Sequence, residues 1–459
     1  MFKKIEIWVL YLTILIGILI TLAFGVLVRQ EIEGITKKGN IDISPLSRPA
    51  AYIARLPEQV LREIFSDPNK LDKPWSEQRD FYNQDGFNGT HNTEESFLLL
   101  SRYDGDLQES VIELVDLTTF EIVHTWNPDI DAFNALVEQV DEFENIVRDG
   151  NNKRQKLMHP KLTEDGGLLF NSYPLRKIDA CSRLIFQNTH DFFHHSIETD
   201  INGNIWVPSQ IYPQSLPIEK VGREAGSLTD DAIVKLSPEG KVLYEKSVSQ
   251  IFIDNGLEYL LFSVGDNRFD TDPIHLNDIQ PVNYDSQYWK KGDVFLSLRH
   301  QSMILLYRPT TNKIIWSGTG PFFHQHDVNI LDNHRISIFN NNSKNFVDGD
   351  VVDGNNEVII YDFKTNTYSA YFKDSFIEND VKTITQGRSE ILQNGDVIIE
   401  ETDYARTLYF NADGFLRWSH VNRAKNGSVY MVGWSRILYT KKDIQTVNSF
   451  LDNKGICNE

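Results

Sequence analysis

Short apolar runs separated by turn residues fill the chain from Ser96 onward, and no other feature constrains its fold as strongly. The runs are rich in Val, Ile, Leu, Phe, Tyr and Trp and cover residues 96–101, 111–115, 121–126, 168–171, 204–207, 232–235, 242–244, 294–298, 304–307, 314–316, 335–339, 357–361, 368–372, 397–400, 407–410 and 415–418. Repeated short strands without intervening helices are typical of an all-β sandwich, barrel or propeller. The one helix expected between them is an amphipathic insertion at residues 130–147, where apolar residues recur at helical spacing.

The turns between these runs repeat, and this repetition favours a β-propeller over the other all-β folds. Asn202-Gly203 and Asn394-Gly395 each precede an apolar run, and such pairs favour tight hairpin turns because both residues tolerate positive φ. His195 and His326 stand at the same distance before two equivalent turns. Roughly 370 residues at about 40–50 per four-stranded blade permit six to eight blades. Because the first strand of each blade lines the central channel, histidines at one repeat position would converge there.

The N-terminal segment from Ile7 to Val28 is an uncharged run of apolar residues, Gly and Thr. Its length suits a bilayer-spanning helix, which needs about 20 such residues. Lys3 and Lys4 precede it, so the positive-inside rule places the short N-terminus in the cytoplasm and the residues after Arg29 outside. A cleaved signal peptide is the alternative, but no A-x-A-like cleavage site follows the run.

Three regions are therefore expected. Residues 1–28 form the cytoplasmic N-terminus and transmembrane anchor, and residues 29–90 a membrane-proximal stalk. The stalk contains a helix at residues 51–65 that Pro57 makes short or kinked. Residues 91–459 form the propeller. The stalk helix and the insertion are compatible with a homodimer, although nothing in the sequence requires one.

The overall charge and the cysteines narrow the partners. A net charge of −20 and a pI near 5.0 argue against nucleic acid or an anionic membrane surface as the main partner. A local cationic pocket for an anionic substrate remains compatible with that balance. Cys181 and Cys457 form either a disulfide in an oxidising compartment or two unpaired thiols, and two such widely separated cysteines do not favour a cysteine-based metal site.

Four histidine-bearing motifs are the main candidates for chemistry, and they contain seven of the chain's 12 histidines. They are HDFFHHSI at residues 190–197, HLNDI at 275–279, SLRHQS at 297–302, and the segment 316–327 that ends in Gln-His-Asp. The residues expected in the channel are His194 or His195, His275, Asn277, Arg299 and His326, with His300 and His324 nearby. Histidine serves as nucleophile, acid, base or metal ligand near neutral pH.

Three interpretations of these motifs compete. Several imidazoles can hold zinc or copper, but Arg299 among them would repel a cation and no pair of carboxylates stands close in sequence. The histidines can instead bond to turns in a propeller that only binds a ligand or protein. The third interpretation is covalent or acid–base catalysis on an anionic group, for which a guanidinium offers planar paired donors and an imidazole can be the nucleophile.

Taken together, the motifs His275-Leu276-Asn277, Ser297-Leu298-Arg299-His300 and Gln325-His326-Asp327 resemble those of the bacterial arylsulfotransferases, which work without 3′-phosphoadenylyl sulfate. The upstream His194-His195-Ser196-Ile197 resembles a further histidine motif of that family. The similarity covers roughly residues 160–420. It implies a six-bladed β-propeller on the periplasmic side of the cell inner membrane, here a single-pass protein held by its N-terminal helix.

The resemblance implies a role for each motif residue. His326 would be the nucleophile that takes the sulfuryl group as a sulfohistidine, with His275, Arg299 and His195 completing the catalytic set. Asn277, His194, His300 and His324 are the candidates for substrate binding. His195 is preferred to His194 as the upstream histidine because it matches His326 in the repeat.

The implied function is an aryl-sulfate sulfotransferase that moves a sulfuryl group from a phenolic sulfate ester to a phenolic acceptor. It would use no cofactor and no metal; a catalytically silent, membrane-anchored binding module is the alternative. Leu298 replaces a serine of the family's Ser-Ser-Arg motif and should not touch the chemistry. Trp316-Ser317-Gly318-Thr319-Gly320 departs from the family's Trp-x-Leu-Gly-Gly, which leaves the substrate open. Phe192, Phe193, Phe322 and Phe323 are expected in the core rather than around a substrate ring.

Overall fold

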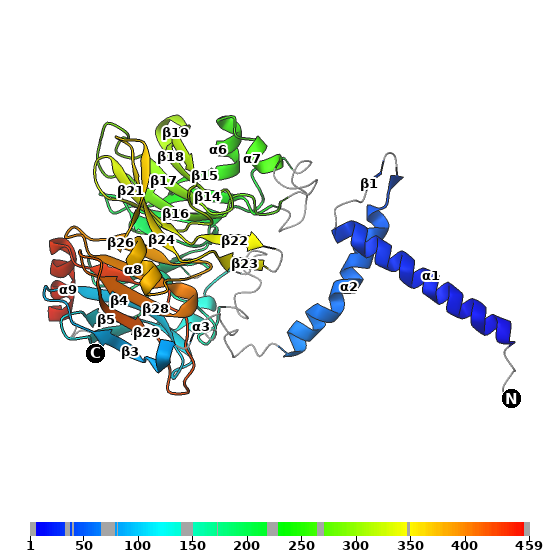
Figure 1. Ribbon diagram of the computed structural model, residues 1–459, viewed down its shortest axis with the longest axis horizontal. Helices are drawn as coiled ribbons and strands as arrows, with labels where there is room; N and C mark the ends of the chain where they lie inside the picture. The colour runs from blue at the N-terminus through cyan, green and yellow to red at the C-terminus, as the bar shows by residue number, and fades with distance from the viewer. Residues whose placement is uncertain are drawn as a thin grey trace. The chain divides into compact units, whose positions relative to one another are not determined.

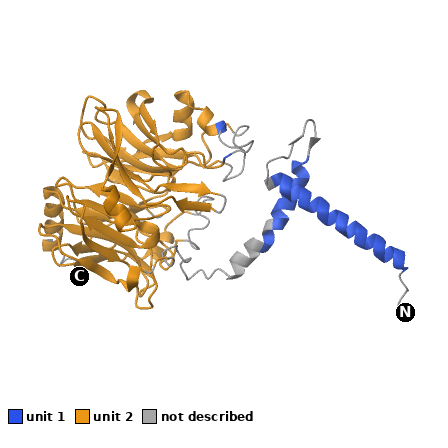
Figure 2. Ribbon diagram, in the orientation of Figure 1, with its two compact units in different colours: residues 1–68, 262–270 blue, residues 69–261, 271–459 orange. Residues whose placement is uncertain are grey.

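A helical N-terminal unit and a β-propeller unit make up the chain in the computed structural model (Figure 2). The first comprises residues 1–68 and 262–270, and the second residues 69–261 and 271–459. The structure describes residues 6–32, 37–38, 41–65, 79, 81–138, 150–171, 173–217, 228–263, 270–346 and 349–453. The N-terminal unit holds α1 (Ile7–Ile32), β1 (Lys37–Lys38), β2 (Ile41–Asp42) and α2 (Ser44–Phe65).

Helix α1 corresponds to the predicted anchor. Residues Ile7–Glu31 have a mean hydropathy of 2.6 in their most apolar window, and none of that window is buried. The hydroxyls of Thr13 and Thr21 donate to backbone carbonyls one turn earlier, at 2.9 and 3.0 Å, so neither needs another partner in an apolar surrounding. The helix is compatible with a single-pass membrane anchor.

Helix α2 is longer than the sequence predicts. A short or kinked helix is expected at residues 51–65, whereas α2 begins at Ser44 and continues through Pro57. Contacts with α1 account for the earlier start, since Ser47 is buried and its hydroxyl bonds to Glu31 of α1.

Six antiparallel sheets form a six-bladed propeller, as the resemblance implies (Figure 1). Blade 1 comprises β7 (Met158–Leu162), β8 (Leu168–Asn171), β9 (Leu175–Ile178) and β10 (Leu184–Asn188). Blade 2 comprises β11 (Phe192–Phe193), β12 (Glu198–Thr199), β13 (Ile205–Gln210), β14 (Asp231–Leu236) and β15 (Val242–Ser247). Blade 3 comprises β16 (Leu276–Pro281), β17 (Val294–Leu298), β18 (Met303–Arg308) and β19 (Lys313–Thr319). Blade 4 comprises β20 (Val328–Ile330), β21 (Arg335–Asn340), β24 (Glu357–Asp362) and β25 (Thr367–Tyr371).

The last two blades combine strands from both ends of the domain. Blade 5 comprises β26 (Arg388–Ile391), β27 (Val397–Glu401), β28 (Arg406–Phe410), β29 (Leu416–Val421) and β3 (Gly86–Gly89). Blade 6 comprises β30 (Arg436–Leu438), β4 (Phe97–Asp104), β5 (Glu109–Asp116) and β6 (Glu121–Trp126). Because β30 pairs with β4 and β3 with β29, each end of the domain is hydrogen-bonded into a blade built mostly from the other end.

Buried carboxylates connect consecutive blades from blade 2 to blade 6. The side chain of an acidic residue in one blade accepts a hydrogen bond from a backbone N–H at the inner strand of its neighbour. The pairs are Asp231 with Leu276 at 2.8 Å, Asp278 with Val328 at 2.9 Å, Asp327 with Ser389 at 3.1 Å, and Glu400 with Trp434 and Ser435 at 2.6 Å each. A hydrogen bond to a charged or buried acceptor is among the stronger ones in a protein, so these contacts fix the inner strands relative to one another.

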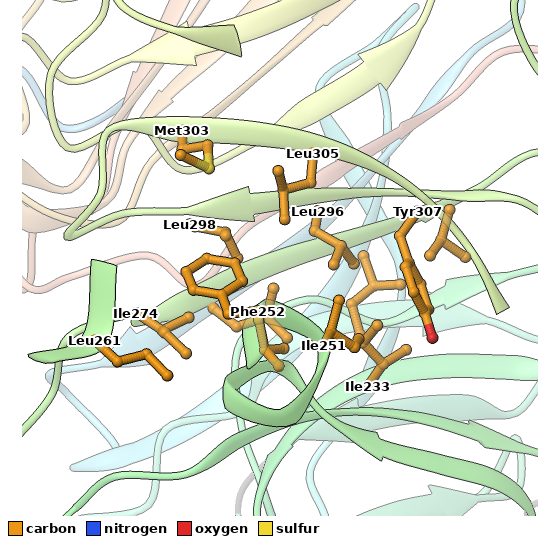
Figure 3. Packing of buried hydrophobic residues seen from close by; sticks show 14 of the residues in the cluster. Ile233, Ile251, Phe252, Leu261, Ile274, Leu296, Leu298, Met303, Leu305 and Tyr307 are labelled. Carbon is orange, nitrogen blue, oxygen red and sulfur yellow. The ribbon is translucent and has the colours of Figure 1, made fainter. Parts of the chain in front are cut away.

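A large apolar cluster supports blade 3 (Figure 3). It lies between blades 2 and 3 and includes α6 (Val248–Asp254), whose Ile251 and Phe252 are fully buried. Leu276 and Leu298 are partners across β16 and β17, and both side chains lie in this cluster. They hold the backbone of the neighbouring His275, Asn277 and Arg299 in place.

Two local expectations have different outcomes. The helix predicted at residues 130–147 is shorter, since α3 covers only Ile130–Asn134. At its end, the Asn134 side chain donates to the carbonyl of Gly150 and accepts from Arg176, at 2.6 Å each. Residues 139–149 lie outside the described part. Cys181 is disulfide-bonded, and Cys457 lies outside the described residues.

Candidate active site

Each blade turns its chain sharply at or just before its innermost strand. One non-glycine residue there has a positive φ, which is uncommon for such residues and concentrates at functional sites. These residues are His159 (53°), His195 (56°), His275 (54°), His324 (50°), Gln386 (54°) and Trp434 (61°). Four of the six are histidines, so the same backbone feature introduces imidazoles from blades 1 to 4.

The rings of three predicted histidines face one another. The His195 ring lies 5.2 Å from that of His275 and 6.3 Å from that of His326, between centroids. His159, from blade 1, lies 6.2 Å from His195, and His300 stacks on His275 at 4.5 Å. The structure therefore brings His195, His275 and His326 together in one histidine cluster.

The turns that place two of these rings are equivalent, as the repeat predicts. Asp200 N donates to Asn204 O at 2.9 Å in blade 2, and Leu331 N donates to Arg335 O at 3.0 Å in blade 4. His195 and His326 each stand five residues before the first residue of these pairs.

His194 lies behind His195 rather than in the cluster. Its side chain is 6% exposed, and its Nδ1 lies 2.6 Å from Nδ1 of His195. On its other side, Nε2 lies 3.3 Å from Oδ1 of Asp231. The two Nδ1 atoms share one proton, so one of these rings donates to the other. His194 is thus placed to orient His195.

His275 has a carboxylate partner. Its Nδ1 lies 2.6 Å from Oδ2 of Asp272, so the ring donates there and Nε2 is the nitrogen left to give or take a proton. His300 Nδ1 lies 2.5 Å from the backbone carbonyl of Asp272, and its Nε2 accepts from Nη1 of Arg299 at 2.7 Å. Asp272 therefore fixes two imidazoles in one stacked pair.

The proton position on His326 follows from its neighbours. Asn341 Nδ2 donates to the carbonyls of Thr383 and Gln386, at 3.2 and 2.8 Å, so its Oδ1 must face Nδ1 of His326, 2.8 Å away. His326 Nδ1 is the donor in that bond, and the lone pair is on Nε2. The backbone N–H of Gln386 donates to this Nε2 at 2.9 Å.

Arg299 and Asn277 supply polar groups beside the rings. Arg299 is 8% exposed, and its Nε has no hydrogen-bond partner among the described residues. Asn277 is fully buried and donates to the carbonyl of Gln325 at 3.1 Å, which commits one of its two amide hydrogens. Both groups can still donate to an anion.

Burial keeps the rings of His195, His324 and His326 neutral. The pKa of His326 is well below its usual value because the ring is buried and because the Arg299 guanidinium repels a second positive charge. Burial, followed by the neighbouring His194, also lowers the pKa of His195 well below its usual value. His324, near Arg299 and 6.2 Å from the His300 ring, has its pKa lowered to about 4, mainly by burial. Neutral imidazoles with lone pairs thus lie beside a permanent positive charge.

Four residues around the rings were not among the sequence candidates. They are His159, Asp272, Asn341 and Gln386. Asp272 stands three residues before His275, so a search for a carboxylate near each histidine would have found it. Gln386 stands beside Gly387, which the repeat aligns with His195 and His326. Nothing in the local sequence distinguishes Asn341 from its neighbours.

One residue that departs from the family motifs, Leu298, packs in the apolar cluster. Trp316, which matches the family's stretch, stacks on Tyr361 at 4.8 Å in another core region. Phe193 and Phe322 are core residues, as expected. Phe192 and Phe323 are not fully buried; Phe323 is 43% exposed and carries Lys344 over its ring.

The ligand atoms of Asp272, His275 and His300 lie within 4.8 Å of one another, a spacing that suits a metal ion. The Arg299 guanidinium bonded to His300 places a positive charge beside them. That charge disfavours a cation and favours an anion at the same place.

Fold and site together define a class of protein: a six-bladed propeller that gathers neutral imidazoles, an arginine and amides at the inner ends of its blades. A family model described as Arylsulfotransferase (ASST) matches residues 163–423, more than half of the chain. The chain belongs to the arylsulfotransferase family. Membership supports aryl sulfotransferase activity in general.

Solved structures resemble this chain at low identity. A protein of unknown function from Bacteroides caccae is 12% identical over 74% of this chain and 98% of its own, with a TM-score of 0.46. TolB from Acinetobacter baumannii is 11% identical over 87% of this chain and 74% of its own, with a TM-score of 0.40. A streptogramin B lyase is 12% identical over 76% and 96%, with a TM-score of 0.35. No curated protein matches the chain. None of these likenesses bears on activity.

Proposed function

We propose that the chain moves a sulfuryl group from a phenolic sulfate ester to a phenolic acceptor, and that His326 carries the group in between. The observation that supports this most is the position of His195, His275 and His326, three imidazoles each bound through Nδ1, beside Arg299 in an arylsulfotransferase chain. A nucleophilic imidazole must be neutral, and the lowered pKa of His326 keeps it so at neutral pH.

The site must above all stabilise the negative charge on the sulfuryl group as it moves. Sulfuryl transfer spreads negative charge over three oxygens in the transition state, as phosphoryl transfer does, so fixed donors aimed at those oxygens lower the barrier. The free Nε of Arg299 and the second amide hydrogen of Asn277 are such donors. Both are held in place before substrate arrives.

The partner on Nδ1 assigns different roles to two of the rings. Asp272 stabilises a positive charge on His275, which therefore suits the general acid and base. Asn341 offers only a neutral oxygen to His326, so that ring gains less from protonation and is better used as a nucleophile and leaving group.

The two half-reactions balance as follows. His326 Nε2 forms a bond to sulfur while the bond from sulfur to the aryl oxygen breaks, and His275, which enters this step with a proton on each ring nitrogen, gives its Nε2 proton to the departing phenolate. In the second half, His275 takes the proton of the acceptor phenol. The phenol oxygen then bonds to sulfur as the bond to His326 breaks, which restores both rings.

The Gln386 amide must change partner during this cycle. Its N–H occupies the His326 lone pair at 2.9 Å, so substrate has to displace that hydrogen bond before attack. A sulfonate oxygen can then accept the same N–H, which turns a group that blocks the nucleophile into an oxyanion donor.

The test is activity of the purified full-length protein in detergent, using a chromogenic aryl sulfate and a phenol without a nucleotide. His326→Ala should abolish turnover, whereas His334→Ala, at a histidine 3.0 Å from Asp332 on a blade turn, should not. Trapping with donor alone should place a sulfuryl adduct on His326 by mass spectrometry. Full turnover in folded His326→Ala, or an adduct on another histidine, would refute the proposed role.

We further propose that α1 anchors the protein in the cell inner membrane with the propeller on the periplasmic side. The lysines that precede α1 support this orientation. Protease added to spheroplasts should digest the propeller; protection of the propeller would contradict the orientation.

A further inference from the structure

A second cluster of ionisable side chains lies apart from the histidine cluster. His190, Asp191 and Glu245 offer ligand atoms that all lie within 4.8 Å of one another. His190 and Asp191 are on the connection from β10 to β11, and Glu245 is on β15, the outermost strand of blade 2. Asn188 Nδ2 donates to the carbonyl of Gly240 at 2.6 Å, which holds this connection against the turn before β15.

Within the described part of the chain, no lysine or arginine forms an ion pair with this cluster. Glu245 Oε2 lies 2.9 Å from Nε2 of His190, and Asp191 accepts from the hydroxyl of Ser209 at 3.2 Å. Asp191 is only 7% exposed. Two carboxylates held this close, one of them buried, repel each other, and a cation between them relieves that repulsion.

We propose that His190, Asp191 and Glu245 bind a divalent first-row transition-metal ion, with Zn²⁺ as the first ion to test. One imidazole and two carboxylates suit Zn²⁺, and three protein ligands leave a position for water. Ca²⁺ and Mg²⁺ fit less well because they prefer oxygen ligands alone. The group around Asp272 is a poorer cation site because Arg299 lies beside it.

The ion would tie β15 to the chain segment that leads into blade 2. That segment continues through β11 to His194 and His195. The metal thus has a structural role here: it restrains the backbone that carries the upstream histidine, without touching the substrate. The proposal does not depend on sulfuryl transfer, since binding can be measured without turnover.

The experiment uses full-length protein in detergent, stripped with a chelator and titrated with Zn²⁺ by calorimetry. Glu245→Gln and His190→Ala each remove one ligand from a partly exposed position and should weaken binding at least about tenfold. His334→Ala is the matched control, because it breaks a different histidine–aspartate contact at the surface, and it should bind as the wild type does. Zn²⁺ should also raise the unfolding temperature of the wild type but not of Glu245→Gln.

Three results would overturn the site. One is wild-type protein that binds no Zn²⁺ in the micromolar range, and a second is equal binding by the wild type and both ligand variants. The third is binding lost in His300→Ala but kept in Glu245→Gln, which would place the ion at the Asp272 group. Co²⁺ substitution gives an independent check, since its absorption bands should appear in the wild type and be lost in His190→Ala.

Discussion

Asp272→Asn removes the negative charge beside His275 while keeping the shape of the side chain at position 272. Oδ2 of Asp272 lies 2.6 Å from Nδ1 of His275, and the two side chains are 27% and 29% exposed. Burial acts to raise the pKa of Asp272, but the hydrogen bond and positive charge from His275 outweigh it and lower that pKa. The carboxylate is therefore ionised at neutral pH and stabilises the imidazolium that forms when His275 accepts a proton.

The expected loss follows from that bond. A hydrogen bond to a charged group contributes about 1.5–3 kcal/mol, and about 1.36 kcal/mol corresponds to a tenfold change in rate. If Asp272 stabilises the charged ring by that amount, the variant has less of the protonated His275 that gives its proton to the phenolate, and kcat should fall roughly 10- to 150-fold. The loss should be larger for sulfate esters of weakly acidic phenols, because a strongly acidic phenol departs without needing a proton.

The assay measures kcat for a series of aryl sulfates that differ in the acidity of the phenol, at one fixed acceptor. Asp332→Asn is the matched control, since Asp332 contacts His334 at 3.0 Å outside the cluster, and it should leave the series unchanged. A uniform loss in Asp272→Asn, independent of the phenol, would show that His275 is not the proton donor. No loss at all would remove Asp272 from the site.

Two further predictions concern charge. Arg299→Lys keeps the positive charge but removes the planar group that bonds His300 at 2.7 Å and offers its free Nε, so kcat/KM should fall at least about tenfold in steady-state kinetics; a change under about threefold would contradict its role. His420 is buried and neutral, with its pKa lowered to about 3, mainly by burial. The unfolded chain takes up that proton below about pH 6.5, so the folded state loses stability as pH falls. Between pH 7.5 and 5 this amounts to about 2 kcal/mol, which His420→Gln should remove in urea unfolding at the two pH values; equal pH dependence of variant and wild type would refute it.

The sequence located most of the middle and outer strands of the propeller, although it missed β9 and β10 of blade 1. Every apolar run named from the sequence lies on a strand. It did not delimit the inner strands β7, β12, β16, β20, β26 and β30. These are short and polar, and β7 and β16 have shifts of register in their pairing. Residues selected for a channel do not show the alternation by which strands are recognised.

The pairing that closes the ring of blades could not be predicted from local sequence either. β3 and β30 contain few residues and pair with strands more than 300 positions away in the chain. Their pairing depends on the other blades already having their curvature, so no short-range pattern announces it. The number of blades was fixed as six only by the resemblance and by the observed pairing.

In the site, too, some residues could be found from their residue type alone, whereas others matter only through a contact made in the folded chain. Histidine is rare enough that its clustering in four motifs identified His195, His275 and His326 as candidates from the sequence. Asp272 and Asn341 are common polar residues, and each matters only through the single atom that it places on an imidazole Nδ1. Such a contact is a property of the folded chain.

These contacts explain how three identical side chains can serve different steps. Each of the three rings is bound through Nδ1, yet the group there differs: a second histidine near Asp231, the carboxylate of Asp272, or the amide of Asn341. A carboxylate favours the protonated ring, whereas an amide does not. The repeated backbone turn places His195 and His275, and His326 follows two residues after the same turn at His324. The residues behind the rings, taken from different strands and loops, set their basicity. Roles in this site are therefore decided one layer behind the rings, where sequence motifs carry the least information.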